Sequence, residues 1–133
     1  MNVAISTGVD PLRRVLVVET GAQCADAVRG PAYTLVVIED ADAAYQAILQ
    51  GSIDAVVVHI EETSGFDERV GLVRRLQNED ATRMVPLLVV ITQRPDRPSA
   101  MTTQRYGSAM IKLTTPDCTG LAEAFAELMW ERR

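Results

Sequence analysis

A single histidine stands where a buried strand is expected to leave its sheet. His59 follows the apolar run at residues 55–58, and Glu61 and Glu62 come shortly after it. Such a run of β-branched and small residues is typical of a strand buried on both faces. Ligands bind, and reactions occur, at the carboxyl ends of the strands in open parallel sheets. His59 is therefore the first candidate for chemistry, as a group that takes up a proton or a phosphoryl group.

Other polar side chains follow similar apolar runs along the chain. Glu19 and Thr20 come after the first run, Thr92 after the fourth, and Lys112 after the weak fifth. The runs occupy residues 15–18, 35–38, 55–58, 87–91 and 109–111. If all five are parallel strands of one sheet, these polar residues gather with His59 at one edge.

Helical patterns lie between the strands and define the fold class. We expect helices at residues 41–50, 67–79 and 99–106, a last helix that begins near Asp117, and a short one within 21–30. Asp40 is placed to cap the first of these and Gly51 to end it. Each helix is expected to bury one apolar face. These faces contain Ala43, Ala44, Ala47 and Ile48 in the helix at 41–50, Val70, Leu72, Val73 and Leu76 in the helix at 67–79, and Leu121, Ala124, Phe125, Leu128 and Met129 in the last helix.

Alternating strands and helices indicate an α/β domain with right-handed crossovers. We predict a three-layer, doubly wound, five-stranded parallel sheet in the flavodoxin-like order 2-1-3-4-5, with helices on both faces. Residues 1–12 show no period and are expected to form a flexible lead-in to a domain at 13–133. The length of 133 residues suits one domain.

Composition excludes several classes of partner. The net charge of −5 disfavours nucleic acid, and no apolar run approaches the length of a membrane helix. Cys24 and Cys118 form no CxxC motif, and with one histidine they do not match the usual zinc ligand sets. We therefore expect no metal and no cofactor, and a reducing cytoplasm as the location.

The sequence also lacks the common catalytic motifs. It contains no Gly-x-Ser-x-Gly, no phosphate-binding GxxxxGK[ST] and no GxGxxG after the first strand. Glu61 and Glu62 resemble a general acid and base only by residue type, since adjacent loop glutamates usually point apart into solvent. We expect no enzymatic activity.

The order of the strand-end residues resembles a response-regulator receiver domain over residues 13–133. Receivers end strand one in an acidic pair, strand three in the phosphorylated aspartate, strand four in Thr or Ser, and strand five in Lys. The matching positions here hold Glu19 and Thr20, His59, Thr92, and Lys112. The resemblance implies that these five residues form a degenerate phosphoacceptor pocket. The resemblance implies two-component signalling. It also implies a degenerate receiver, or pseudo-receiver, because Mg²⁺ requires oxygen ligands and only one of the three carboxylates is present.

Two of these residues acquire structural roles in this interpretation. Lys112 is expected to form a salt bridge with Glu19, and His59 to be a neutral imidazole hydrogen-bonded to Thr92 or to a loop amide. A phosphorylated histidine and a pH-sensing histidine are the alternatives for His59.

The last helix offers a surface for a partner. Trp130 lies nine residues after Leu121, about 180° around a helix from its buried stripe. An outward Trp is often an anchor for another surface, and Tyr106 and Met101 extend the same patch. We therefore expect a phosphorylation-independent adaptor or regulatory module that acts through protein–protein contacts, with a possible homodimer through the last helix. The alternatives are a nucleotide-type ligand site among Glu19, His59, Thr92 and Lys112, and an active phosphoacceptor receiver.

Overall fold

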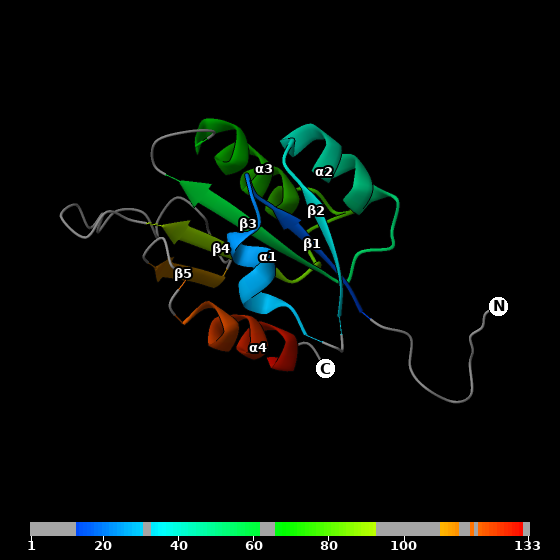
Figure 1. The fold of residues 1–133 in the computed structure, drawn as a ribbon. Helices are drawn as coiled ribbons and strands as arrows, with labels where there is room; N and C mark the ends of the chain where they lie inside the picture. The colour runs from blue at the N-terminus through cyan, green and yellow to red at the C-terminus, as the bar shows by residue number, and fades with distance from the viewer. Residues whose placement is uncertain are drawn as a thin grey trace, which may run out of the picture.

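A computed structural model describes residues 13–30, 33–61, 66–92, 110–114, 118 and 120–131 (Figure 1). The strands are β1 (Arg13–Val18), β2 (Tyr33–Ile38), β3 (Ala55–Glu61), β4 (Leu87–Thr92) and β5 (Met110–Thr114). The helices are α1 (Gln23–Val28), α2 (Ala41–Leu49), α3 (Phe66–Asn78) and α4 (Leu121–Glu131). Strands and helices alternate along the chain until β4, as the sequence predicts.

The strands form one parallel sheet. β1 lies between β2 and β3, β4 pairs with the other side of β3, and β5 pairs with β4, so the order is β2-β1-β3-β4-β5. In the register, Val18 is opposite Val58, and His59 is opposite Val90. The predicted class, an α/β parallel sheet with helices, is confirmed. The carboxyl ends of β1, β3 and β4 therefore lie at one edge of the sheet.

Helices cover both faces of the sheet, which gives three layers. Figure 1 shows α2 and α3 together on one face and α1 and α4 on the other. Successive residues of β1 alternate between the two cores, with Leu16 and Val18 packed on the α2–α3 side and Val15 and Val17 on the α1–α4 side. The alternation follows from the two-residue period of a strand. It also explains why a central strand of this fold has an unbroken apolar sequence.

The predicted start and end of α2 agree with the structure, but one residue of its predicted buried face does not. The Asp40 carboxylate accepts a hydrogen bond from the Ala43 amide at 2.8 Å, and Gly51 adopts a φ of 84° just after the helix. Ala43 itself is exposed, so its predicted place in the core is wrong, and Tyr45 is buried instead. Rotating the helix to bury an aromatic ring removes more apolar area from water than burying a methyl group does.

Tyr45 connects α2 to the end of α3. The Tyr45 hydroxyl donates to the Glu79 carboxylate, and the Arg75 guanidinium lies over the Tyr45 ring, 3.7 Å from its centre. The hydrogen bond from Tyr45, and then that from Arg75, lowers the pKa of Glu79 below its ordinary value. The contact therefore joins the two helices that cover this face of the sheet.

Two strands extend beyond their predicted ends. β3 continues past His59 to Glu61, and β5 continues past Lys112 to Thr114, so neither His59 nor Lys112 is the last residue of its strand. The reason is that each strand keeps a partner: Glu61 is opposite Thr92, and Thr92 is opposite Thr114. The predicted helix at 99–106, Asp117 and the lead-in at 1–12 lie outside the described residues. The last helix begins at Leu121, a few residues later than predicted.

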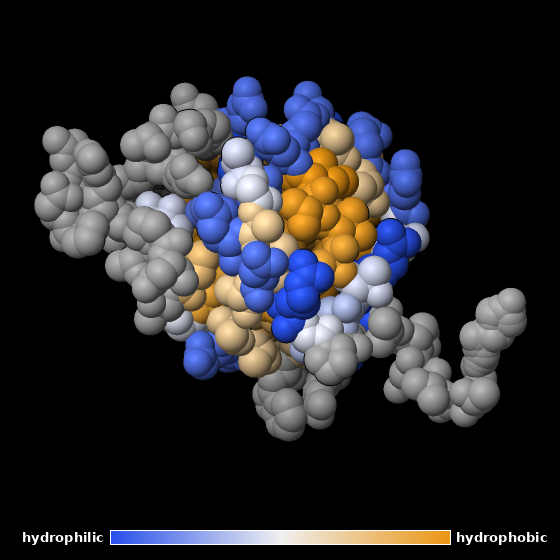
Figure 2. Space-filling model, in the orientation of Figure 1, coloured by the Kyte–Doolittle hydropathy of each residue, from blue (hydrophilic) through white to orange (hydrophobic). Residues whose placement is uncertain are grey.

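The edge strand β2 leaves apolar side chains at the surface. Val37 is 43% exposed, and Leu35, Val36 and Ile38 are only partly buried. Figure 2 shows this apolar area over β2, surrounded by hydrophilic residues. None of the helices in the described part of the chain is long and apolar enough to cross a membrane.

Candidate functional site at the carboxyl edge of the sheet

Glu19 is buried directly after β1, where its carboxylate binds the start of α1. Its two oxygens accept hydrogen bonds from the Cys24 and Ala25 amides, each at 2.9 Å, and only 1% of the residue is exposed. Amides in the first turn of a helix have no partner within that helix. Gly21, with a φ of 95°, provides the tight turn that brings α1 back toward the carboxylate. Glu19 therefore acts as a cap for α1.

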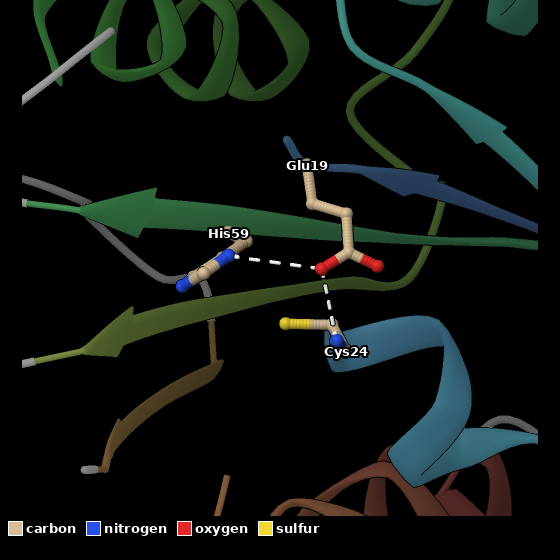
Figure 3. Close-up of side chains that lie close together, drawn as sticks. All are labelled: Glu19, Cys24 and His59. Carbon is tan, nitrogen blue, oxygen red and sulfur yellow. Dashed lines mark hydrogen bonds and ion pairs between the residues drawn. The ribbon is translucent and has the colours of Figure 1, made fainter. Parts of the chain in front are cut away.

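His59 is also buried, with 2% exposure, and its two ring nitrogens face different groups. Nε2 lies 3.1 Å from the Thr92 hydroxyl oxygen, and Nδ1 lies 3.7 Å from Oε1 of Glu19 (Figure 3). Val90 is opposite His59 in the register, and Thr92, two residues further on, lies on the same face of the sheet. The predicted hydrogen bond between His59 and Thr92 is confirmed. Its burial argues against a phosphorylated histidine, which needs an exposed nitrogen.

Cys24 completes a compact cluster that the sequence analysis missed. Figure 3 shows its sulfur beside the Glu19 carboxylate, on the side of His59. One ligand atom each from Glu19, Cys24 and His59 lie within 4.8 Å of one another. The pKa of the Cys24 thiol is raised, first by burial, then by the Glu19 charge, and then by the neighbouring Cys118 thiol. The signal available was that Cys24 lies five residues after Glu19, across a glycine turn.

Arg69 is the second functional residue that the sequence analysis missed. It projects from α3 and is 5% exposed, and its guanidinium donates to the carbonyl oxygen of His59 at 3.0 Å and to the Thr20 hydroxyl at 2.8 Å. A third bond, at 3.4 Å, reaches the carbonyl oxygen of Glu39. The available signal was a charged residue three positions before Leu72 in the apolar stripe of α3. A cation thus bridges β3 and the segments that follow β1 and β2.

The structure describes only some of the other residues predicted for the site and the contact surface. Thr20 is exposed and Thr92 is half-buried. Lys112 lies in β5 and Trp130 in α4, but their side chains are outside the described part of the chain, as are Met101 and Tyr106 entirely. The salt bridge between Lys112 and Glu19 therefore stays a prediction. The structure brings together Glu19, His59 and Thr92 from the predicted pocket, and it adds Cys24 and Arg69.

Solved structures with a similar fold include response regulators and a sensor protein. A chain from Chloroflexus aurantiacus described as a response regulator aligns with a TM-score of 0.69 and 16% identity, over 90% of this chain and 99% of that one. A sensor protein from Polaromonas sp. JS666 gives 0.69 and 16%, over 92% and 100%. A response regulator protein from Burkholderia multivorans gives 0.55 and 21%, over 90% and 96%. The chain therefore has the receiver fold.

Sequence comparison adds no closer relative. No protein-family model matches the chain, and no curated protein matches it either. The likeness consequently rests on the arrangement of helices and strands, and the chemistry of the site has to be argued from its own residues.

Proposed function

We propose that this chain is a receiver-like signalling domain that acts through protein contacts, without phosphorylation and without catalysis. It would serve as an adaptor or a regulatory module in a two-component-type pathway. One observation carries the proposal: the groups at the carboxyl edge of the sheet already have partners within the domain. Glu19 caps α1, His59 contacts Thr92, and Arg69 bridges three segments.

The donor atoms at this edge are poorly suited to phosphoryl transfer. By resemblance, a receiver accepts the phosphoryl group on an aspartate and holds Mg²⁺ with that aspartate and an acidic pair. Here the aspartate position holds the nitrogens of His59, and the pair is reduced to Glu19 and the neutral Thr20. Mg²⁺ demands oxygen ligands in near-octahedral geometry, and transfer needs the ion to neutralise the phosphoryl charge. Of the three carboxylates only Glu19 remains, and each of its oxygens already accepts a hydrogen bond from a backbone amide.

Arg69 holds the segments at the carboxyl edge of the sheet in one arrangement. A receiver is a switch only if its strand-end loops can move when the phosphoryl group arrives. In this chain a buried guanidinium joins the His59 carbonyl, Thr20 and the Glu39 carbonyl through bonds of 2.8 to 3.4 Å. An arginine is always charged and has five donors in a rigid plane, so it fixes these three positions together. The domain is thereby held in a single state.

Phosphorylation independence is tested directly with acetyl phosphate and Mg²⁺. We expect the intact mass of the protein to stay unchanged, because no carboxylate stands at the acceptor position and the magnesium ligands are missing. A receiver with an intact acceptor aspartate, treated in parallel, provides the control for the reagent. A mass gain of one phosphoryl group that disappears in Glu19→Gln would contradict the proposal.

The outward face of α4 is the proposed contact surface. Leu121, Phe125, Leu128 and Met129 face the core, as the sequence predicts, while Ala122 and Ala126 are exposed. Position 130 continues the spacing of Ala122 and Ala126, four residues apart, along the helix. The neighbouring Glu123 and Glu127 are exposed as well, so a partner would present an apolar centre with basic groups around it. In the absence of that partner, two copies of this chain would associate through the same face.

The substitution Trp130→Ala is expected to weaken association by about 2 kcal/mol, roughly 30-fold, because a central Trp is often the main anchor of an interface. Sedimentation velocity at increasing concentrations measures self-association. Met84→Ala is the matched control, since Met84 is 70% exposed and lies before β4, at the opposite end of the strands. Equal association of Trp130→Ala and the wild type, both folded by circular dichroism, would count against this face.

A further inference from the structure

We propose that Glu19, Cys24 and His59 form a binding site for a zinc ion. The proposal is separate from the question of phosphorylation and from the contact face on α4. It rests on the position of three different donor groups in one buried cluster, contributed by the end of β1, the first turn of α1 and the end region of β3. Carboxylate oxygen, thiolate sulfur and imidazole nitrogen are the three donors that Zn²⁺ takes from proteins.

The spacing of the donors suits a single ion. Zinc binds oxygen and nitrogen at about 2.0 to 2.2 Å and sulfur at about 2.3 Å, so two ligands of a tetrahedral ion lie roughly 3.3 to 3.8 Å apart. Nδ1 of His59 and Oε1 of Glu19 are 3.7 Å apart, longer than a typical N–H···O hydrogen bond and slightly above the roughly 3.3 to 3.6 Å that a nitrogen and an oxygen ligand of one ion require. All three ligand atoms lie within 4.8 Å of one another. Small side-chain rotations therefore suffice to close the set around an ion.

The neighbours of the cluster orient its ligands. Histidines that bind metals usually donate their other ring N–H to an oxygen, and this fixes the nitrogen that faces the ion. Nε2 of His59 lies 3.1 Å from the Thr92 hydroxyl, so donation from Nε2 leaves the lone pair of Nδ1 directed toward Glu19. The Glu19 carboxylate is held by the Cys24 and Ala25 amides, and each of its oxygens keeps a second lone pair. The ligands are thus pre-positioned from outside the cluster.

Charge balance favours a divalent ion at this place. Glu19 is a buried acid, and an uncompensated charge in the interior is costly. Zn²⁺ with the Glu19 carboxylate and a Cys24 thiolate forms a neutral group, and the thiol proton is released to solvent when the ion binds. Sulfur and nitrogen donors also select zinc over magnesium.

The test begins with chelator-treated full-length protein. We expect it to take up one Zn²⁺ per chain and to gain at least about 5 °C in Tm at a zinc concentration about 100-fold above the Kd, with no gain from Mg²⁺. Cobalt is expected to give a thiolate-to-metal charge-transfer band in the near ultraviolet. The band requires a cysteine ligand, so it separates this cluster from surface carboxylates.

Variants assign the donors. Cys24→Ser is expected to lose the cobalt band and to weaken zinc binding by at least about 100-fold, since even residues that only orient a ligand contribute about 10- to 100-fold. Glu39→Gln is the matched control: it removes an exposed carboxylate at the same edge of the sheet and is expected to bind zinc like the wild type. A wild-type protein without the cobalt band overturns the proposal, whether or not the variants fold. So does a Cys24→Ser variant that keeps the band.

Discussion

Replacing Arg69 with methionine is expected to lower the free energy of unfolding by about 3 kcal/mol. The guanidinium donates to two backbone carbonyls and one hydroxyl, and hydrogen bonds from a charged group contribute about 1.5 to 3 kcal/mol each. Methionine retains most of the apolar stem but donates nothing. The carbonyl of His59, bonded at 3.0 Å in a buried position, then loses its donor.

An opposing effect has to be weighed in this prediction. Arg69 forms no ion pair with any residue that the structure describes, so its burial carries a desolvation cost that methionine would relieve. Three bonds to oxygen offset that cost, and the buried carbonyl on β3 cannot turn to water once the guanidinium is removed. The loss of bonds should therefore dominate, although the sum is smaller than three separate bond energies.

Urea unfolding of Arg69→Met, Arg69→Lys and Arg74→Met measures these contributions. Arg74 is exposed on the same helix, so its substitution should change stability by no more than about 0.5 kcal/mol. Lysine keeps the charge without the planar array of donors and is expected to recover only a small part of the loss. Equal stability of Arg69→Met and Arg74→Met would show that the guanidinium does not hold the strand ends together.

The sequence was sufficient to predict the elements whose pattern is set by local rules. Apolar runs with a defined length mark β1 to β4, and Asp40 and Gly51 bound α2 because a cap and a positive φ act within a few residues. The ends of β3 and β5 were predicted too short, since a strand continues as long as its neighbour offers backbone partners. That partner is set by the register between distant segments, which no local pattern reveals.

The candidate site was predictable only where a residue follows a strand. Glu19, His59 and Thr92 were expected at one edge because parallel strands bring their carboxyl ends together. Arg69 comes from the middle of the chain on α3, and its function depends on the length and direction of a long side chain. Cys24 was not considered a metal ligand because the sequence contains no CxxC motif. Its partners Glu19 and His59 come from the ends of two other elements, so no motif of neighbouring residues could reveal them. Long-range contacts of this kind follow from the fold and not from spacing.

Replacing Glu19 with glutamine is expected to lower the free energy of unfolding by about 2 kcal/mol in metal-free protein. The carboxylate gives one oxygen to the Cys24 amide and one to the Ala25 amide, each at 2.9 Å. Glutamine has a single oxygen, so its NH₂ group would face one of these N–H donors. A buried donor without an acceptor costs about 1 to 3 kcal/mol, and relief of the buried negative charge offsets part of that loss.

The effect should be directly measurable at the start of α1. This helix spans only six residues, too few to be stable without tertiary contacts, so its first turn depends on the Glu19 oxygens. Hydrogen exchange of the Cys24 and Ala25 amides should accelerate by roughly 30-fold in Glu19→Gln, the factor that corresponds to about 2 kcal/mol. Amides of β3, which exchange through global unfolding, should accelerate by a similar factor but from a much slower wild-type rate. Glu39→Gln, which alters an exposed carboxylate at the same edge, should leave both measurements unchanged. Wild-type exchange rates at Cys24 and Ala25 in Glu19→Gln would mean that the carboxylate does not support α1, and the edge of the sheet would then lack its proposed internal anchor.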